Sequence, residues 1–552
     1  MSIPARAPDR SRERSPAPVA VSAASVTKSF RLPHEKYSTM KERVIHPLRH
    51  RSYEALTALD DVSFEVHRGE FVGIVGRNGS GKSTLLKCLS RIYRADAGDI
   101  RVDGRLAPFV DLGVGFNSEM TAADNAILNA ILLGLSREDA RARLGDIIAF
   151  AELERFVDLK LKNFSSGMLM RLGFAVTTEV DADVLLFDEV LAVGDAGFQA
   201  KCLERLEALR DSGRTVLLVT HDMETVQRFC DRAMLLDAGR LVDIGSPDRI
   251  AQEYEERNAR APAERPSVEM ARSTRKAAPR GRGAGPPMFG RDPRRVATVA
   301  RALAVAEFRV RYTESLLSYL WVMAGPLIFF AILYAVFTQV GAFDHGVKNY
   351  PVYLLTALVL WTFFATGTTT AVNCLVRQED LLRKLPLPHI TIPLSVVLGA
   401  AFDLLANLVV VFIFVFVAGI TPRVSWLELP VIVVLLSFLT TGTALALSAL
   451  YVRHRDIDQI WVLLRQALFY GSAIFYVVVF LPTNLQRPAM ANPLTAAFTE
   501  TRHAVIDPSA PSAAAVSGGA IRLLIPLAVV AGVFALGVWI FRRESPLVVE
   551  NL

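Results

Sequence analysis

Six long apolar runs without Asp, Glu, Lys or Arg lie in the C-terminal half of the chain. They cover residues 316–343, 349–376, 404–422, 429–452, 466–486 and 523–541. A helix rises about 1.5 Å per residue, so about 20 apolar residues cross the ~30 Å hydrocarbon core of a bilayer. A buried soluble core explains one such run, but not six. The sequence therefore predicts an all-α, multi-pass membrane domain with six transmembrane helices.

The composition fits a chain that is partly soluble and partly embedded in lipid. Hydrophobic residues make up 52% of the 552 residues and charged residues 21%, against roughly 25% charged residues in soluble proteins. The formal net charge of +6 does not favour nucleic acid as a partner, because excess Lys and Arg in cytoplasmic loops explains it equally well. Four cysteines without a CxxC pair predict neither a disulfide framework nor a zinc site.

The rest of the chain divides by composition. Residues 1–21 are rich in Arg, Pro and Ser, which predicts a disordered tail and not a signal peptide. Residues 22–257 alternate β-rich and helical stretches, the pattern of an α/β domain with a largely parallel sheet. Residues 258–296 are basic and rich in Pro, Gly and Ala, which predicts a linker before the membrane domain of residues 297–552.

The charges of the loops predict an orientation in the membrane. If the α/β domain is cytoplasmic, the inner segments hold ten Arg and Lys residues and the outer segments hold five. This bias agrees with the positive-inside rule. We therefore expect a multi-pass protein of the cytoplasmic (inner) membrane, with its α/β domain in the cytoplasm.

A phosphate-binding loop follows the apolar strand FVGIV. Residues 76–83 match the pattern G-x4-G-K-[ST] and lead directly into a helix. The backbone N–H groups of such a loop close around phosphates at the helix N-terminus. Lys82 is expected to reach the β- and γ-phosphates of ATP, and Ser83 to ligate Mg²⁺. The predicted ATP-binding residues of this P-loop are Gly76, Asn78, Gly79, Ser80, Gly81, Lys82, Ser83 and Thr84.

A pair of carboxylates ends a second apolar strand, VLLFDE, about 100 residues later. Behind a P-loop, Asp188 is expected to hold Mg²⁺ together with Ser83, and Glu189 to orient and polarise the attacking water. His221 follows the next predicted strand, TVLLV, where it would contact the γ-phosphate. A structural role is the alternative for a lone histidine. The sequence thus predicts Glu189 and His221 as catalytic residues.

In order and spacing, these motifs resemble the nucleotide-binding domain of ABC transporters over about residues 22–256. The resemblance implies a P-loop NTPase fold of the ABC type. The stretch FSSGM is similar to a degenerate form of the family's signature motif, which implies contact with ATP bound to the P-loop of a second copy. The residues concerned are Ser165, Ser166 and Gly167. Two copies would then complete each hydrolytic site, with Asp195 in the turn called the D-loop.

The same resemblance implies two further contacts. An aromatic ring is expected to stack on adenine, and Phe30 or Tyr53 would supply it, although a hydrophobic core contact explains either residue equally well. The glutamine that usually couples the ATPase to the membrane domain is not evident. Asp111 or Glu119 stands in that neighbourhood.

A narrower resemblance is to exporters of O-antigen, capsule and teichoic-acid polymers. It is carried by the insertion between Phe30 and Ala58 and by residues 111–121 and 188–195. The carbohydrate-binding domain that some O-antigen exporters append has no counterpart here, because the linker and the membrane region follow directly.

The membrane half carries the same resemblance. Residues 308–337 are similar to the start of the permease in these exporters, where a basic amphipathic segment lies on the membrane surface. Arg309 and Arg311 would then reach the lipid headgroups. Residues 381–388 resemble the cytoplasmic loop that transmits motion from the ATPase.

Two of the predicted membrane helices are rich in aromatic residues. Sugar rings stack their CH faces on aromatic rings, so an aromatic lining would give a glycan a sliding path, while lipid-facing aromatic residues are the alternative. Asp403 and Arg465 flank apolar runs. Ionisable groups at membrane depth are functional candidates, and a position at the inner boundary of the membrane is the alternative for both residues. The candidates for the substrate path are Trp361, Phe364, Tyr470 and Tyr476.

Together, the motifs and the resemblance imply a homodimeric half-transporter that uses ATP and Mg²⁺. Its expected cargo is a lipid-linked polysaccharide of the O-antigen, capsule, teichoic-acid or galactan type, and its other partners are membrane lipids. Export of a small lipid or drug-like amphiphile is the alternative. A membrane ATPase that transmits force without cargo is a third hypothesis, which the short outer loops disfavour.

Overall fold

The computed structural model describes residues 18–33, 53–109, 115–189, 196–260, 293–312, 316–339 and 347–551. The chain divides into two compact units. The first takes most of the chain up to residue 260 and is built on β-sheets; the second takes most of the chain from residue 293 and is helical.

A six-stranded sheet with the strand order β5-β6-β7-β3-β8-β9 lies at the centre of the first unit. Its first five strands are parallel, and β9 pairs antiparallel with β8. All residues of β3 and β7 are buried, as expected of central parallel strands that are covered on both faces. The strands are β3 (Phe71–Val75), β5 (Leu106–Phe109), β6 (Val184–Asp188), β7 (Thr215–Val219), β8 (Arg232–Asp237) and β9 (Arg240–Gly245).

A second, antiparallel sheet has the order β2-β1-β4. It consists of β1 (Val19–Pro33), β2 (Tyr53–His67) and β4 (Ala97–Val102). Its apolar face shares one hydrophobic core with β3 and with the helix after the P-loop, through residues such as Val26, Ile74 and Leu85. Strand β1 starts at Val19, so the last three residues of the predicted disordered tail, 19–21, belong to a strand instead.

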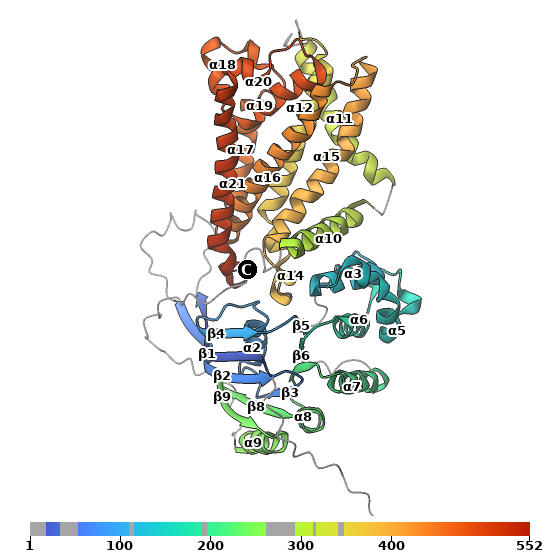
Figure 1. The fold of residues 1–552 in the computed structure, drawn as a ribbon, viewed down its shortest axis with the longest axis vertical. Helices are drawn as coiled ribbons and strands as arrows, with labels where there is room; N and C mark the ends of the chain where they lie inside the picture. The colour runs from blue at the N-terminus through green and yellow to red at the C-terminus, as the bar shows by residue number, and fades with distance from the viewer. Residues whose placement is uncertain are drawn as a thin grey trace, which may run out of the picture. The chain divides into compact units, whose positions relative to one another are not determined.

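Eight α-helices accompany these sheets in the described residues. Side-chain oxygens accept N–H groups at several of their N-termini, for example Thr121 at α3 and Ser165 at α6, which satisfies donors that a helix cannot pair internally. Helices α3, α5 and α6 pack together and form a helical region beside β5 (Figure 1). The helices are α2 (Lys82–Leu89), α3 (Ala122–Leu133), α4 (Arg137–Ala142), α5 (Leu144–Ala151), α6 (Ser166–Glu179), α7 (Ala196–Asp211), α8 (Met223–Phe229) and α9 (Pro247–Arg260).

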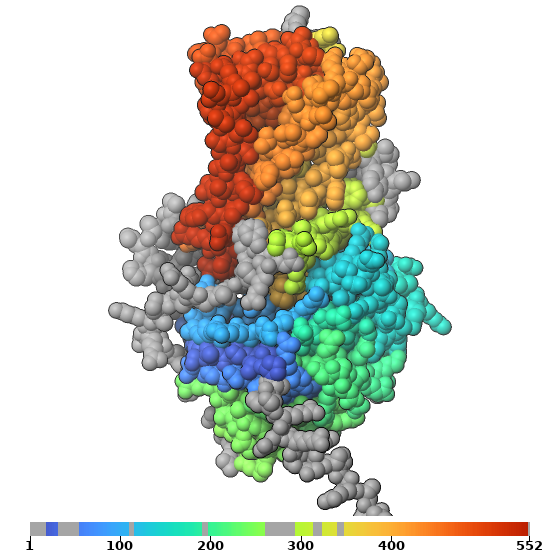
Figure 2. All heavy atoms as spheres, viewed as in Figure 1, coloured from blue at the N-terminus to red at the C-terminus, as the bar shows by residue number. Residues whose placement is uncertain are grey.

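The second unit is a helical bundle in which long apolar helices lie alongside one another (Figure 1). Figure 2 shows that side chains fill the spaces between these helices on the visible face. The longer helices are α10 (Pro293–Tyr312), α11 (Leu316–Gln339), α12 (Tyr350–Val372), α15 (Thr391–Val417), α16 (Glu428–Arg453), α17 (Ile457–Gly471) and α21 (Leu524–Glu544). The shorter ones are α13 (Cys374–Arg377), α14 (Glu379–Lys384), α18 (Thr483–Ala489), α19 (Pro493–Thr501), α20 (Ala513–Ser517) and α22 (Val548–Asn551).

Helices α16 and α21 approach each other through glycine. A Cβ atom added to Gly537 would lie 2.0 Å from the Gly442 carbonyl oxygen, and one added to Gly442 would lie 2.5 Å from Cα of Phe534. Small residues allow such close approach between membrane helices, where van der Waals packing is a main source of association. This contact therefore requires glycine at both positions.

Among the described residues, four helical segments are long and apolar enough to cross a membrane: Tyr350–Val372, Thr391–Val417, Val424–Arg453 and Ala520–Leu547. They match four of the six predicted spans. The run 466–486 differs from the prediction, because α17 ends at Gly471 and the chain continues in short elements. The remaining run begins in α11, whose 24 residues include Pro326. Six spans are thus not confirmed.

The break after α17 has a clear physical basis. Non-helical backbone at membrane depth is tolerated where protein groups satisfy its carbonyls. The Tyr350 hydroxyl of α12 donates to the Phe475 carbonyl at 2.7 Å. The Tyr353 hydroxyl bonds the Ala473 carbonyl and lies 3.1 Å from that of Tyr476.

The ends of the predicted linker are helical. Helix α9 continues to Arg260 and α10 begins at Pro293, while residues 261–292 lie outside the described part of the chain.

Candidate functional site

The loop between β3 and α2 is shaped by glycine. Gly76 and Gly81 have φ angles of +157° and +104°. A Cβ atom on Gly76 would lie 2.2 Å from the Leu236 carbonyl oxygen, and one on Gly81 would lie 2.5 Å from that of Ala58. Other residues would therefore displace the loop. Gly79, at φ +81°, faces open space on its Cβ side, so the loop's outer surface is accessible.

Polar groups of this loop suit a phosphate. The Lys82 ammonium donates to the carbonyl oxygens of Gly76 at 2.7 Å and Arg77 at 2.9 Å, which holds it against the loop. The Ser80 hydroxyl is buried and has no hydrogen-bond partner among the described residues. Ser83 is exposed at the start of α2, and Thr84 is half-buried beside it. A buried cation and an orphaned hydroxyl fit the oxygen-rich phosphates of ATP, as the sequence predicts.

The order of the strands brings the predicted catalytic groups together. Strand β7 lies between β3 and β6, and all three run parallel. Their carboxyl ends therefore place the P-loop, His221 and the Asp188–Glu189 pair at one edge of the sheet. Ligands of open α/β sheets bind at this edge.

Glu189 is held in an unusual backbone conformation at this edge. Its φ angle is +51°, which costs roughly 1–2 kcal/mol for a residue with a Cβ atom. Its N–H donates to the Val219 carbonyl of the next strand at 2.9 Å, which fixes the turn. Its carboxylate is half-exposed and lies 3.6 Å from His221 Nδ1. Both side chains are thus accessible to a ligand and close to each other.

Electrostatics link the carboxylates to the P-loop lysine. Burial lowers the pKa of Lys82, while the negative charges of Glu189 and Asp188 oppose this shift. Lys82 is 7% exposed. The site therefore joins one buried cation to two carboxylates, and Ser83 and Asp188 offer the hard oxygen ligands that Mg²⁺ prefers.

The predicted signature residues stand at the start of α6. The Ser165 hydroxyl accepts the Met168 N–H at 3.3 Å and caps the helix. Ser165 and Ser166 are exposed, and nothing but the Ser165 hydroxyl lies within 4 Å of the Cβ position of Gly167. Figure 1 shows α6 beside β5 and β6, away from α2. The described fold thus leaves this helix start open.

Glu119, one of the two predicted coupling residues, faces the segment that leads into α6. Its carboxylate lies 2.9 Å from Lys162 Nζ and 3.7 Å from Lys160 Nζ. The hydrogen bond from Lys162 is the main cause that lowers the pKa of Glu119. The other candidate, Asp111, and the D-loop residue Asp195 lie outside the described residues.

No observation distinguishes Phe30 from Tyr53 as the residue that stacks on adenine. Phe30 is half-buried, with its ring 5.3 Å from that of Tyr93 in an edge-on contact and with Lys28 Nζ 5.3 Å from its centre. The side chain of Tyr53 lies outside the described part. The stacking roles stay predictions.

The aromatic candidates of the membrane half lie in one continuous cluster. The Trp361 ring is 5.8 Å from Phe364 and 5.4 Å from Phe469. From Phe469 the contacts continue to Tyr470 at 5.3 Å and to Phe475 at 6.2 Å. Tyr476 contacts Phe475 at 5.2 Å, and Phe364 contacts Trp461 at 6.1 Å. Trp361 and Phe364 are buried, while Tyr470 is 58% exposed.

Arg311, which the sequence places near the lipid headgroups, contacts a carboxylate of another helix. It lies 3.3 Å from Asp403 of α15, and the Tyr312 hydroxyl donates to the same carboxylate at 2.9 Å. The sequence could not show this pairing, because α10 and α15 lie far apart along the chain.

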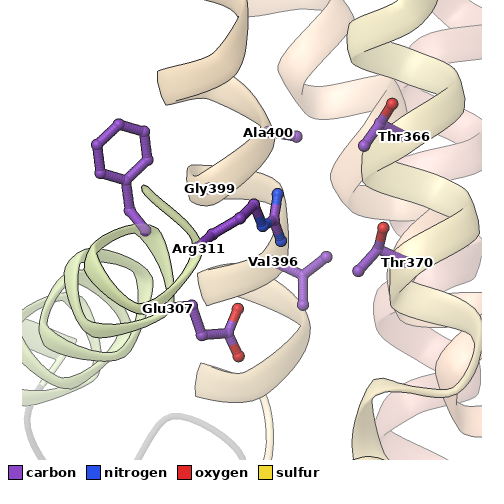
Figure 3. A pocket seen from close by; sticks show the side chains of 8 residues that line it. Glu307, Arg311, Thr366, Thr370, Val396, Gly399 and Ala400 are labelled. Atoms are coloured by element: carbon purple, nitrogen blue, oxygen red, sulfur yellow. The ribbon is translucent and has the colours of Figure 1, made fainter. Parts of the chain in front are cut away.

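Arg311 also borders a pocket between α10, α12 and α15. Figure 3 shows Glu307 and Arg311 extending from α10 toward α12, where Thr366 and Thr370 line the other side. Burial raises the pKa of Glu307, against the charges of Arg311 and Arg377. Opposite charges thus meet at this pocket.

Two further residues of α17, Arg465 and Trp461, contact helix α12. Arg465, noted from the sequence, donates to the Thr369 hydroxyl of α12 at 2.9 Å. Trp461 was not among the sequence candidates. Its signal is the four-residue spacing of Trp461, Arg465 and Phe469, which places them on one helix face.

Comparison with known families supports both the predicted ATPase domain and the predicted membrane domain. Residues 59–192 match the family profile described as ABC transporter, and residues 298–506 match the one described as ABC-2 type transporter. An ABC-2 domain and several apolar helices make this a multi-pass membrane protein.

Relatives match the ATPase half. An O-antigen export system ATP-binding protein of Klebsiella pneumoniae is 42% identical over 242 residues, which cover 43% of this chain and 97% of that protein. One of Myxococcus xanthus is 42% identical over 43% of this chain and 56% of its own length.

A teichoic acids export ATP-binding protein of Lactococcus lactis is 34% identical over 43% of this chain and 51% of that protein. The chain thus spans about half the length of the Myxococcus and Lactococcus relatives and nearly all of the Klebsiella one. It belongs to the ABC transporter family, as an ABC-type ATPase joined to an ABC-2 type membrane domain in one polypeptide.

Proposed function

We propose that this chain is a homodimeric half-transporter that uses ATP to export a lipid-linked polysaccharide across the cytoplasmic membrane. The names of the relatives support the class of cargo, since two are O-antigen exporters and one is a teichoic-acid exporter. The polymer would be of the O-antigen, capsule, teichoic-acid or galactan type. The bacterial relatives also favour the inner membrane.

The proposed membrane domain has six spans in each copy. Four come from the helices that are long enough to cross a bilayer. The other two would be α11, with 24 residues, and α17 with the short elements that follow it. An even number of spans returns the C-terminus to the side of the ATPase.

ATP hydrolysis would rely on the edge of the central sheet. The P-loop residues Gly76 to Thr84 would bind the phosphates, with Lys82 as the cation. Ser83 and Asp188 would hold Mg²⁺, which neutralises phosphate charge when bound. Glu189 would accept a proton from the attacking water and orient it, and His221 would contact the γ-phosphate.

The proposed dimer follows from the position of the signature residues. Ser165 and Ser166 are exposed at the start of α6, in a region away from α2. A helix N-terminus favours anions, and this one would meet the γ-phosphate on the P-loop of a second copy. Asp195 would line the same interface. Glu119 and Asp111 would couple the ATPase to the membrane domain.

The aromatic cluster is the single observation that carries the cargo assignment. Six rings in contact extend from Trp461 through Trp361 and Phe469 to Tyr476. Aromatic rings bind the CH faces of sugar rings without demanding one sugar sequence. A polymer can therefore move from ring to ring, which a pocket shaped for one compact molecule would prevent.

A deletion strain tests this proposal. We expect surface glycan to disappear and lipid-linked polymer to accumulate inside the cell, with both restored by the wild-type chain. Replacement of Trp361 and Tyr476 by Ala should impair export while ATP hydrolysis continues. Unchanged surface glycan in the deletion strain, with increased sensitivity to amphiphilic drugs, would instead favour the small-amphiphile exporter.

A further inference from the structure

Asp403 of α15 and Arg465 of α17, the two ionisable residues noted from the sequence, have different partners in the structure. Asp403 on α15 is neutralised by Arg311 at 3.3 Å and by the Tyr312 hydroxyl at 2.9 Å. Arg465 on α17 donates to the neutral hydroxyl of Thr369 and makes no ion pair within the described residues. A cation in the interior of a membrane protein is costly unless an anion compensates it, and it usually has a function.

The surroundings of Arg465 come from two helices. Trp461, Arg465 and Phe469 are spaced by four residues and so share one face of α17. Each contacts α12: Trp461 meets Phe364 at 6.1 Å, Arg465 meets Thr369, and Phe469 meets Trp361 at 5.4 Å. Along this face of α17, Arg465 therefore lies between Trp461 and Phe469, two members of the aromatic cluster.

One turn before Arg465 on α17, Trp461 carries a polar group without a partner among the described residues. Trp461 is 6% exposed, and its indole N–H has no hydrogen-bond partner among the described residues. A buried donor without an acceptor costs about 1–3 kcal/mol. One turn of α17 thus presents a guanidinium and an indole N–H, both donors, and no carboxylate of the described residues receives them.

The Arg465 side chain is accessible from outside helix α17. Arg465 is half-buried, so part of this side chain remains exposed. Arg465 is the ninth residue of the helix, about 12 Å along its axis from Ile457. A group that moves along this helix would pass the guanidinium partway through.

We infer that Arg465, with the Trp461 N–H, is the recognition site for an anionic group of the transported molecule. A phosphate or carboxylate supplies the oxygen acceptors that these donors require, and charge-assisted hydrogen bonds are the strong ones. This inference rests on the proposed function, because it places the anion on the cargo. The anion is either the phosphate that links a glycan to its lipid or an acidic group of the glycan itself.

The test measures anion binding by the purified full chain in lipid nanodiscs. The lipid-linkage probe is geranylgeranyl diphosphate, compared with uncharged geranylgeraniol. The glycan probe is oligogalacturonate, compared with neutral maltoheptaose. The variants are Arg465→Gln, which removes the charge, and Arg465→Lys, which keeps it. Arg423→Gln is the matched control, since it removes an exposed charge from the same domain.

We expect Arg465→Gln to weaken binding of one anionic probe by about tenfold or more, the effect of losing a charge-assisted hydrogen bond. Arg465→Lys should keep most of the affinity, and Arg423→Gln all of it. Loss confined to the diphosphate assigns the lipid linkage, and loss confined to oligogalacturonate assigns the glycan. Trp461→Phe, which keeps an aromatic ring but removes the N–H, should weaken the same probe about threefold or more.

Equal affinity of wild type, Arg465→Gln and Trp461→Phe for both anionic probes would overturn the inference. So would an equal loss for the uncharged probes, since that would show a purely apolar contact. These outcomes are independent of the deletion strain: if surface glycan is unchanged there, the proposed export function fails whether or not Arg465 binds anions.

Discussion

The Nδ1 atom of His221 lies 3.6 Å from Oε1 of Glu189, at the edge where strands β6 and β7 end. The two residues are separated by more than 30 positions in the sequence. They meet because β6 and β7 are adjacent and parallel, so their carboxyl ends coincide. The positive φ angle of Glu189 then turns its carboxylate out of the strand.

Glu189→Gln should reduce ATP hydrolysis by at least about 100-fold, because an amide cannot accept the proton of the attacking water. ATP binding should persist, since Lys82 and the P-loop are unchanged, and the nucleotide should remain trapped. Release of phosphate and retention of labelled ATP measure both effects. Glu224→Gln, at the exposed start of α8, is the control. Wild-type hydrolysis by Glu189→Gln would show that another residue is the base.

Tyr353→Phe should destabilise the membrane domain by about 1–3 kcal/mol, because the Ala473 and Tyr476 carbonyls lose the hydroxyl they share. Thermal unfolding in detergent, followed by fluorescence, measures the change. Tyr451→Phe is the matched control, since no hydrogen bond of its hydroxyl is found in the described residues. An unchanged melting temperature for Tyr353→Phe would mean that the break after α17 is held by other contacts.

Gly537→Ala should lower the stability of the bundle by about 1–3 kcal/mol, because the new methyl group would meet the Gly442 carbonyl oxygen at 2.0 Å. Gly532→Ala on the same helix is the control, because nothing lies within 4 Å of its Cβ position. Expression level and melting temperature distinguish the two. If both variants behave alike, α16 and α21 do not pack through these glycines.

Glu307 should make the stability of the membrane domain depend on pH. Burial raises its folded-state pKa above the ordinary value of 4.5. Between pH 4.5 and the raised pKa of Glu307, the folded state binds more protons than the unfolded state. The stability of the folded state therefore falls as the pH rises through this range. Glu307→Gln should flatten that dependence. Melting temperatures measured upward from pH 4.5 give the test, and an identical pH profile of the variant would contradict it.

The ATPase half could be predicted well because its signals are local. The P-loop residues are neighbours in the sequence. Asp188 and Glu189 stand at the end of the apolar strand β6 and His221 just beyond the end of β7, so the adjacency of these strands brings them together. The end of α17 at Gly471 could not be predicted in this way. The apolar run continues to residue 486, and the helix ends where hydroxyls of Tyr350 and Tyr353, more than 100 residues earlier, satisfy the backbone.

For the site in the membrane domain, the sequence predicted the types of residue involved but not their contacts. Aromatic residues pointed to Trp361 and Tyr476, but not to Trp461, whose importance depends on its contact with Phe364 of another helix. Likewise, Asp403 and Arg465 look equivalent in the sequence. Only the pairing of Asp403 with Arg311 distinguishes them, and that contact joins residues 92 positions apart.

The most direct test of the account is complementation between two inactive copies. Lys82→Ala disables the P-loop, and Ser165→Arg disables the signature segment, so neither variant alone should hydrolyse ATP. In a heterodimer, purified through two different tags, one composite site keeps both intact elements. We predict hydrolysis up to about half the wild-type rate, as one of two sites in a twofold dimer is restored. A heterodimer as inactive as its parents would contradict the claim that two copies share each ATP.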